Sequence, residues 1–547
     1  MTDIRRTVLW VVFTFSLLLL WDAWQRHNGR PSMFGGAVAT SAAPASAPPN
    51  HPATHPAAGP GASVAPAPTA PVAGDIVTIE TDRVRAQFDT LGGSLVQVEL
   101  LGHADDSAER APMKVLERSR HYAAQTGLVE VAGAPNHTTA LRLVSTERKL
   151  AEGAQQLNLR FESEPQGGLK LVKTYTLERG SYAIKVRHEV QNVSETALQP
   201  RLYLQLQRDG SKFDGGVAQS FGAATFTGPA IYHDKIKYTK VEFGDLDKKA
   251  FDGERQAQDG WVAMAQHFFV SAWLRETAGP REFFARRIAP GLYTVGMLVP
   301  LNQIAPGATA VADDVLFVGP QEEKNLAQLA HGFDLVKDYG WFHILAKPLF
   351  WLLDQIHKMV GNWGWAIVLL VVLLKIAFYG LNASAYKSMA KMKKVNPRIM
   401  ELRERLKDNP QQMQQEMMRL YKEEKVNPLG SCLPMLLQIP FFIALYWVLL
   451  SSVEMRHAPW LGWITDLSAK DPWYVLPALM TASSLLQVWL QPAPPDPMQA
   501  KLMWIMPLMF SFMFFFFPAG LVLYWLVNNL LSIAQQWMIN KQLGVTH

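Results

Sequence analysis

The sequence predicts a multi-domain membrane protein with a six-helix transmembrane α core, a large antiparallel β-domain on one side of the membrane and a helical hairpin on the other. Composition is the first of three observations behind this fold class. Of the 547 residues, 49% are hydrophobic and only 18% are charged, which is unusually apolar for a soluble protein. Second, long uncharged runs follow one another after residue 359. Third, apolar and polar residues alternate with the period of a strand between Asp75 and Phe333.

The N-terminal residues predict a membrane anchor followed by a spacer. Thr7 to Trp21 is uncharged and follows an arginine pair, a pattern shared by cleaved signal peptides and uncleaved anchors. We expect a signal anchor over residues 1–24, because no small-residue cleavage site abuts the apolar run. The more distant Ser41-Ala42-Ala43 keeps cleavage open as the alternative. Residues 25–74 are rich in Ala and Pro and predict an extended linker.

Residues 75–333 predict one large β-domain. Short alternating segments such as Ile76 to Glu80 and Tyr182 to Val190 are separated by Gly, Asn and Asp turns, which indicates an antiparallel β-sandwich. The histidines, which include His121, His188 and His267, are scattered without the spacing of metal ligands. The sequence therefore indicates no catalytic, metal or cofactor site in this domain.

Residues 334–358 predict an amphipathic segment on the membrane surface. Aromatic and aliphatic residues such as Trp341, Phe350 and Ile356 are interrupted by Lys347 and Asp354. A helix with this mixture of faces favours the interface between water and lipid. We expect the segment to lead the chain from the β-domain into the membrane.

Residues 359–547 predict five further membrane helices. Uncharged runs cover Met359 to Leu374, Val426 to Val453, Pro472 to Pro495 and Leu502 to Asn540. One crossing of a bilayer needs about 20 residues, so the last run is long enough for two. Pro518-Ala519-Gly520 supplies a turn near its middle. With the N-terminal anchor, this makes a six-helix core.

The distribution of Lys and Arg among the loops predicts which side of the membrane each domain occupies. The loop from Ser384 to Lys425 is rich in Lys and Arg, whereas the loop from Ser451 to Asp471 is not. By the positive-inside rule the first loop and both termini are cytoplasmic and the β-domain is outside. The net charge is +5, but the basic residues lie beside apolar runs. We therefore expect the phospholipid bilayer as a partner and no direct binding of nucleic acid.

The cytoplasmic loop predicts a helical hairpin over residues 384–427. Apolar residues recur with helical spacing on both sides of a turn at Asn409-Pro410. A methionine-rich seam runs along both arms and, with a neighbouring lysine, is a candidate contact surface for substrates or partners: Met389, Lys391, Met392, Met413 and Met417. The alternative is that these methionines form the hairpin's own core.

Lys375 is the candidate functional centre. It follows the apolar run Met359 to Leu374 and is itself followed by further uncharged residues. A charged side chain at the centre of a membrane helix costs about 2.5–3.5 kcal/mol and usually faces protein or water at a functional site. The alternative is a lysine near the helix end whose ammonium extends to the lipid headgroups.

Other polar residues lie at membrane depth. Trp525, Asn528, Ser532 and Gln535 fall on one helix face, and Gln438 lies in another span. Singly, each could join neighbouring helices by a hydrogen bond worth about 0.6 kcal/mol. Together with Lys375 they predict a hydrophilic groove that carries one positive charge.

Several longer motifs carry a family resemblance. They are Gly361-Asn362-Trp363-Gly364-Trp365, Ser388-Met389-Ala390-Lys391-Met392, Glu424 to Cys432, Asp496-Pro497-Met498-Gln499 and Phe517 to Trp525. From about Trp341 to Asn540 the chain resembles the YidC/Oxa/Alb family of membrane protein insertases. The N-terminal helix, the linker and the large β-domain resemble the Gram-negative branch of this family. The resemblance implies a periplasmic β-supersandwich like that of galactose mutarotases. It also implies a groove whose positive charge, usually arginine, maps onto Lys375 and whose aromatic contact, usually tyrosine, maps onto Trp525.

The function implied by this resemblance is insertion and folding of inner-membrane proteins. Such a protein acts both independently and with the Sec translocon, and it needs no cofactor. Its partners are nascent inner-membrane proteins, with the ribosome and the signal recognition particle receptor contacted through cytoplasmic loops. Two rival functions differ in sequence features. A secondary transporter should show inverted repeats with broken helices, and a sugar-modifying enzyme should show paired carboxylates or histidines in the β-domain.

Overall fold

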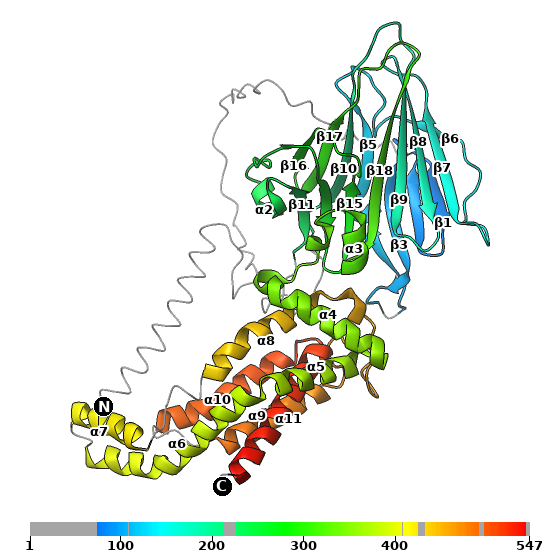
Figure 1. Cartoon of the computed structure of the whole chain (residues 1–547). Helices are drawn as coiled ribbons and strands as arrows, with labels where there is room; N and C mark the ends of the chain where they lie inside the picture. Colours follow the sequence, from blue (N-terminus) through cyan, green and yellow to red (C-terminus); the bar gives the residue numbers. More distant parts are fainter. Residues whose placement is uncertain are drawn as a thin grey trace, which may run out of the picture. The chain divides into compact units, whose positions relative to one another are not determined.

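The computed structural model describes residues 74–107, 109–211, 226–406, 409–424, 433–491 and 497–542. These residues form two compact units, one ending at Lys337 and the other beginning at Asp338. Each unit is described by itself (Figure 1). The predicted signal anchor and nearly all of the predicted linker lie outside the described residues.

The first unit is a β-sandwich of two nine-stranded antiparallel sheets. The order in the first sheet is β1 (Ile76–Glu80), β2 (Val84–Asp89), β3 (Ser94–Ala104), β5 (Ala123–Val129), β10 (Arg201–Asp209), β17 (Leu292–Pro300), β16 (Arg281–Ala289) and β13 (Gln256–Ala257), with β4 (Pro112–Leu116) paired to β3. The order in the second sheet is β12 (Lys237–Lys240), β11 (Gly228–His233), β14 (Trp261–Ala265), β15 (Phe269–Leu274), β18 (Thr309–Pro320), β9 (Ala183–Asn192), β8 (Leu169–Glu178), β7 (Gln156–Ser163) and β6 (Leu141–Leu143). The predicted antiparallel sandwich is therefore confirmed.

Burial along the strands shows which sheet faces are covered. In β2 and β7 buried residues alternate with more exposed ones, as expected when one face packs on the core and the other meets water. In β14 and β15 every residue is buried. The reason is a second layer, because α3 (Glu323–Leu329) and η3 (Phe333–Val336) contribute Leu326, Phe333 and Val336 to a cluster with Trp261.

Charged groups are also buried inside this sandwich, each with several partners. Lys173 on β8 donates from Nζ to the carbonyl oxygens of Gly92 at 2.7 Å and Thr126 at 2.8 Å. Burial lowers the pKa of Lys173 to about 7. Asp314 on β18 is fully buried and accepts a hydrogen bond from Arg275 at 2.7 Å. The Lys173 contacts join the second sheet to the first, whereas the Arg275–Asp314 pair lies within the second sheet.

The second unit is helical. Its helices are α4 (His343–Val360), α5 (Trp363–Ala377), α6 (Tyr379–Arg405), α7 (Pro410–Glu423), α8 (Leu433–Ser451), α9 (Val475–Leu490), α10 (Pro497–Phe514) and α11 (Ala519–Gln542), with short 3₁₀ turns η4 (Gly340–Phe342) and η6 (Val453–Met455). α10 ends at Phe514 and α11 begins at Ala519. The break between them contains Pro518, where the sequence predicts a turn.

Local sequence explains how α4 gives way to α5. Gly361 ends α4 in the left-handed region with φ of 70°, a conformation that glycine adopts without strain. The Asn362 side chain then caps α5 by accepting a hydrogen bond from the Trp365 backbone N–H at 3.1 Å. A β-carbon on Gly364 would lie 2.2 Å from Cδ1 of Trp460. The motif that contains these residues is thus required by backbone geometry and close packing.

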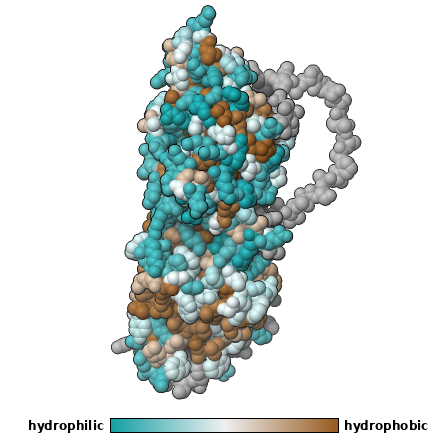
Figure 2. Space-filling view, turned by 90° about the vertical axis from the view of Figure 1, so that its right-hand side faces the viewer, coloured by the Kyte–Doolittle hydropathy of each residue, from teal (hydrophilic) through white to brown (hydrophobic). Residues whose placement is uncertain are grey.

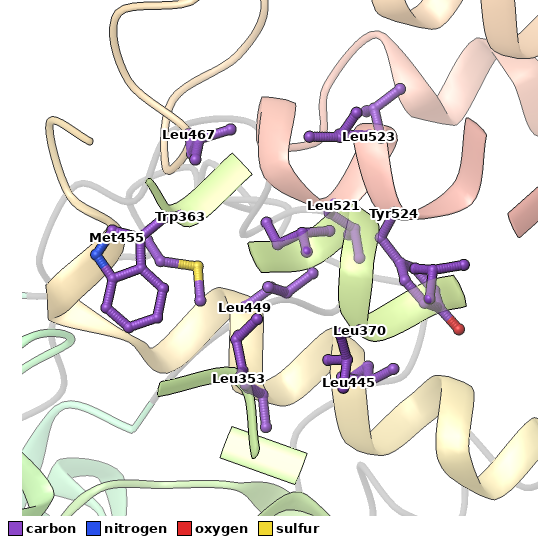
Figure 3. Packing of buried hydrophobic residues seen from close by; sticks show 14 of the residues in the cluster. Leu353, Trp363, Leu370, Leu445, Leu449, Met455, Leu467, Leu521, Leu523 and Tyr524 are labelled. Atoms are coloured by element: carbon purple, nitrogen blue, oxygen red, sulfur yellow. The ribbon is translucent and has the colours of Figure 1, made fainter. Parts of the chain in front are cut away.

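The main core of the helical unit is one large apolar cluster. Leu353 from α4, Leu370 from α5, Leu445 and Leu449 from α8 and Leu521 from α11 converge there (Figure 3). Burial of apolar surface is worth about 25 cal/mol per Å², so this cluster fixes the mutual arrangement of α4, α5, α8 and α11. It also sets which faces of α5 and α11 meet.

The outer surface of the helical unit is rich in apolar side chains. Ile505, Met509 and Phe512 of α10 are each more than half exposed, and hydrophobic colour gathers over this unit in the lower part of Figure 2. Extended apolar surface marks contact with a membrane or with another protein. Within the described residues, no helix taken alone combines the length and apolar character needed for a membrane crossing, whereas the bent pair Trp363–Ala377 and Tyr379–Met392 does so by length and composition.

Candidate functional site

Lys375 lies in the last turn of α5, and its amine contacts α11. Nζ donates a hydrogen bond to Oγ of Ser532 at 2.7 Å. The Ser532 hydroxyl in turn donates to the backbone carbonyl of Asn528, one turn earlier, at 2.8 Å. The lone pairs of the Ser532 oxygen are therefore directed toward Lys375. We call Lys375, Asn528, Ser532 and Gln535 the Lys375 cluster.

The charge of Lys375 is unbalanced. In the part of the chain that the structure describes, Ser532 is its hydrogen-bond acceptor and no carboxylate forms an ion pair with it. An ammonium group carries three hydrogen-bond donors and no acceptor, so the Ser532 hydroxyl satisfies only one of the three. This arrangement can bind an incoming carboxylate without first breaking an existing ion pair.

Gln535 reaches the bent helix on the other side of its break. Its Nε2 donates to the backbone carbonyl of Tyr379 at 3.4 Å. Tyr379 is the first residue of α6, while Lys375 belongs to α5. One face of α11 therefore contacts both arms of the bent pair.

Trp525 lies on α11 beside an aromatic wall. Its ring centroid is 3.9 Å from that of Phe442 on α8 and 5.6 Å from that of Phe514 at the end of α10. The indole Nε1 is buried and has no hydrogen-bond partner within the described residues. Trp525 thus presents a large apolar surface with one unused donor.

A second polar face of α11 points toward α9 and was missed by sequence reasoning. Asn529 donates from Nδ2 to Oγ of Ser483 at 2.9 Å. Gln536, two turns further along, donates to the Leu490 carbonyl at 3.4 Å. The repeated spacing of polar residues on α11 was a visible signal, but only packing shows which of its two polar faces meets Lys375.

The methionine seam is divided between core and surface. Met392 of α6 and Met417 of α7 pack against a small buried cluster around Val395 and Ile399. This favours the alternative in which they form the hairpin's own core. Met389 and Met413 are partly buried and Lys391 is exposed. The more exposed methionines of the hairpin are Met400 and Met418, at 45% and 53%, which the sequence did not single out.

The structure bears differently on Gln438 and on the expected lack of a metal site. The side chain of Gln438 lies outside the described residues, although its backbone belongs to α8. Among the described residues, no group of three or more His, Cys, Asp and Glu is arranged to hold a metal ion. The helical unit therefore presents a cation, hydroxyl and amide groups, and an aromatic wall.

Comparisons with known proteins place these features in a family context. Two family models match the chain: 60Kd inner membrane protein over residues 355–545 and YidC periplasmic domain over residues 76–352. The membrane protein insertase YidC of Cupriavidus metallidurans is 53% identical, with 99% of this chain and 98% of that protein covered. The protein of the same name from Janthinobacterium sp. (strain Marseille) is 48% identical over the full length of both. A crystal structure of an active YidC insertase with its first transmembrane domain resolved matches with a TM-score of 0.38 at 17% identity, covering 85% of this chain and 94% of that one.

Proposed function

The chain belongs to the YidC family of inner-membrane protein insertases, and we propose that it inserts membrane proteins through a hydrophilic groove that carries one positive charge. Family models cover both of its units, and full-length relatives are insertases at about half identity. The family resemblance carried by the motifs of the sequence is thereby confirmed.

The observation that carries the proposal is the unbalanced charge of Lys375. A charge withdrawn from water is normally paired, yet the amine of Lys375, which is partly buried, has a single hydroxyl acceptor among the described residues. Two unit charges 4 Å apart attract by about 4 kcal/mol at an effective dielectric constant of 20. A carboxylate on an incoming segment would therefore gain substantially from approaching Lys375.

The remaining residues suggest a path for the apolar part of the substrate. A hydrophobic helix would pass along Trp525 and the neighbouring aromatic rings of Phe442 and Phe514. Release into lipid is driven by apolar burial at about 25 cal/mol per Å². The membrane potential favours outward movement of an acidic tail by about 2.3 kcal/mol per charge per 100 mV. Lys375 retains the positive charge of the family's arginine but not its planar fork, so the proposed attraction is that of a point charge.

Topology and partners complete the proposal. Six membrane crossings would place both termini and the α6–α7 hairpin in the cytoplasm and the β-sandwich in the periplasm, in agreement with the positive-inside rule. The hairpin would meet ribosomes and the signal recognition particle receptor, and the helical unit would meet the Sec translocon when larger substrates are handled. A chaperone role follows, because a partly inserted helix held at the groove is protected while it folds. No covalent chemistry is required, and the protein is proposed not to be an enzyme.

The proposal is tested by depletion of the protein in its own host. A small inner-membrane protein with acidic residues, such as the ATP synthase c subunit, is then followed by protease protection. We expect its insertion to fail while a secreted, purely Sec-dependent protein is still exported. Complementation with Lys375→Ala should leave export of the secreted protein unchanged and should not restore insertion of the acidic substrate. Normal insertion after depletion would contradict the insertase function, and full rescue by Lys375→Ala would contradict the role of the charge.

A further inference from the structure

We propose that Gln535 is a positioning residue. Together, Ser532 and Gln535 hold the bent helix pair α5–α6 on both sides of its break, an arrangement we call the clasp. Through it, the position of the Lys375 amine determines the position of the α6–α7 hairpin. This inference rests on the proposed function, because it gives Lys375 the role of receiving a substrate carboxylate. It adds a mechanical consequence of that event, namely a change in the angle at which α6 leaves the membrane unit.

The break itself needs external support. α5, which ends at Ala377, and α6, which begins at Tyr379, are bent by 68° relative to each other. The Phe378 N–H still bonds to the Leu374 carbonyl at 2.9 Å, and the Asn382 N–H bonds to the Phe378 carbonyl at 3.0 Å. The bend has no proline at the break to fix it, and a β-carbon on Gly380 would meet no atom within 4 Å. The ring of Phe378 at the break packs against that of Phe441 on α8, with 5.0 Å between their centroids, so contacts from other helices contribute to the angle.

α11 supplies such contacts on each side of the break. Ser532 and Gln535 are three residues apart and share a face of α11. Ser532 accepts from Lys375, three residues before Phe378, and Gln535 donates to the carbonyl of Tyr379, directly after it. α11 is itself held in the buried apolar core by residues such as Leu521. It can therefore act as a fixed reference for both arms.

Arrival of a carboxylate changes one half of this clasp. If the amine of Lys375 turns from Ser532 toward the carboxylate, the last turn of α5 loses its hydrogen bond to α11 beside the break. The apolar contacts between α5 and α11 further from the break persist, as does the contact of Gln535 with α6. α6 has 27 residues, so it is about 40 Å long at 1.5 Å per residue. A change of about 10° in the bend would move its far end by about 7 Å. The α6–α7 hairpin would thus report occupancy of Lys375.

The neighbouring residue provides a matched control. Gln536 makes the same kind of hydrogen bond as Gln535, from Nε2 to a backbone carbonyl at 3.4 Å, but to Leu490 of α9 instead of the bent pair. Both side chains are less than one-tenth exposed. Methionine has nearly the shape of glutamine without its amide. Gln535→Met and Gln536→Met therefore remove equivalent bonds from α11, of which only the first reaches the break.

The experiment measures the position of the hairpin in the full-length protein in lipid nanodiscs. The single cysteine is removed by Cys432→Ser, and Gln415→Cys and Lys541→Cys, both at exposed positions, carry spin labels on α7 and at the end of α11. Pulsed electron paramagnetic resonance then gives the distance distribution. We expect Gln535→Met to shift or broaden it by about 7 Å, as a 10° change of bend requires, and Gln536→Met to leave it unchanged. An unchanged distribution in Gln535→Met, or equal changes in both variants, would overturn the proposal.

A second variant separates this inference from the proposed function. Lys375→Met removes the other half of the clasp and should also displace the hairpin, without any substrate being present. If the hairpin stays in place in Lys375→Met and Gln535→Met while Lys375→Ala still abolishes insertion in cells, the clasp is wrong and the proposed function stands. If the hairpin moves but insertion does not depend on Lys375, the clasp stands and the proposed function is wrong.

Discussion

Each unit of this molecule places a lysine among apolar side chains, but the two lysines are surrounded differently. In the β-sandwich, Lys173 is fully buried and donates to two backbone carbonyls, and its pKa falls to about 7. With a pKa near 7, losing a proton from the ammonium group costs little at neutral pH. The neutral amine that results has two N–H groups, one for each of the two carbonyls. In the helical unit, Lys375 has one hydroxyl partner among the described residues. Lys173 is therefore part of the fold, whereas Lys375 keeps capacity for a ligand.

The same contrast extends to the other buried charges of the sandwich. Asp314 accepts from Arg275 at 2.7 Å, and His188 lies 3.5 Å away. Burial lowers the pKa of His188. Arg281 donates to the carbonyls of Gly260 and Thr277 at 2.8 and 2.6 Å. Nδ1 of His188 and Oδ2 of Asp314 face each other without a hydrogen bond. Because the neighbours of all these groups belong to the sandwich, a change in them should alter stability before it alters function.

The largest expected effect on stability follows from breaking the buried ion pair. Arg275→Met leaves the carboxylate of Asp314 buried without its main partner, which should lower the free energy of unfolding by about 3–5 kcal/mol. Arg287→Met is the control, because Arg287 pairs with Asp247 at 3.2 Å where both side chains are 45% exposed. That exposed pair is worth about 0–1 kcal/mol. Chemical denaturation followed by intrinsic fluorescence measures the stability of both variants. An equal loss of unfolding free energy in the two would contradict the distinction between buried and exposed charges.

Acidification should destabilise the sandwich by a somewhat smaller amount. Burial lowers the pKa of His137 to about 4 in the folded protein. In the unfolded chain the same imidazole binds a proton near its ordinary pKa of about 6.5. Because only the unfolded state takes up this proton between those values, the free energy of unfolding falls as the pH drops from 6.5 to 4, by about 3 kcal/mol in all.

His137→Phe tests this titration directly. The variant loses the hydrogen bond between the ring Nδ1 and the Tyr203 hydroxyl, at 2.6 Å, so it should be less stable at neutral pH. Its stability should nevertheless change less than that of the parent protein between pH 6.5 and 4. Thermal unfolding across this range gives the comparison. Parallel curves for parent and variant would show that another group is responsible.

The functional counterpart concerns Lys375. Lys375→Met should reduce insertion of an acid-bearing substrate about tenfold, equivalent to about 1.4 kcal/mol, while stability changes by only about 0.6 kcal/mol, the typical worth of a hydrogen bond within a membrane. A substrate whose acidic residues are replaced by amides provides the control and should insert equally well into membranes containing either protein. Quantitative protease protection in reconstituted vesicles separates these cases. A loss of insertion that is the same for both substrates would mean that the charge does not act on carboxylates.

The sequence predicted the two-sheet sandwich because alternation records which residues face a core. It could not predict the strand order, since β5 pairs with β10 and β10 with β17 across long stretches of chain. In the helical unit, the charge of Lys375 was visible from the unusual position of a lysine after an apolar run. Its partner was not, because the rotation of α11 is set by packing against several helices. Ser532 was predicted in the polar face, but so was Trp525, which contacts aromatic rings instead.

The smallest expected effect tests whether a polar residue on α11 is enough to mark a site. Asn529 is buried and donates a hydrogen bond to Ser483 of α9 at 2.9 Å. Although it lies in the helical unit, it therefore has a partner within the fold, as Lys173 does in the sandwich. Asn529→Leu should lower stability by about 0.6 kcal/mol and leave insertion of acidic substrates unchanged. Ser532→Ala removes a hydroxyl from the adjacent face and should alter insertion, because it frees the amine of Lys375. If Asn529→Leu changed insertion as much as Ser532→Ala, the hydrogen-bond partners of a polar group would no longer distinguish structural from functional positions in this helix.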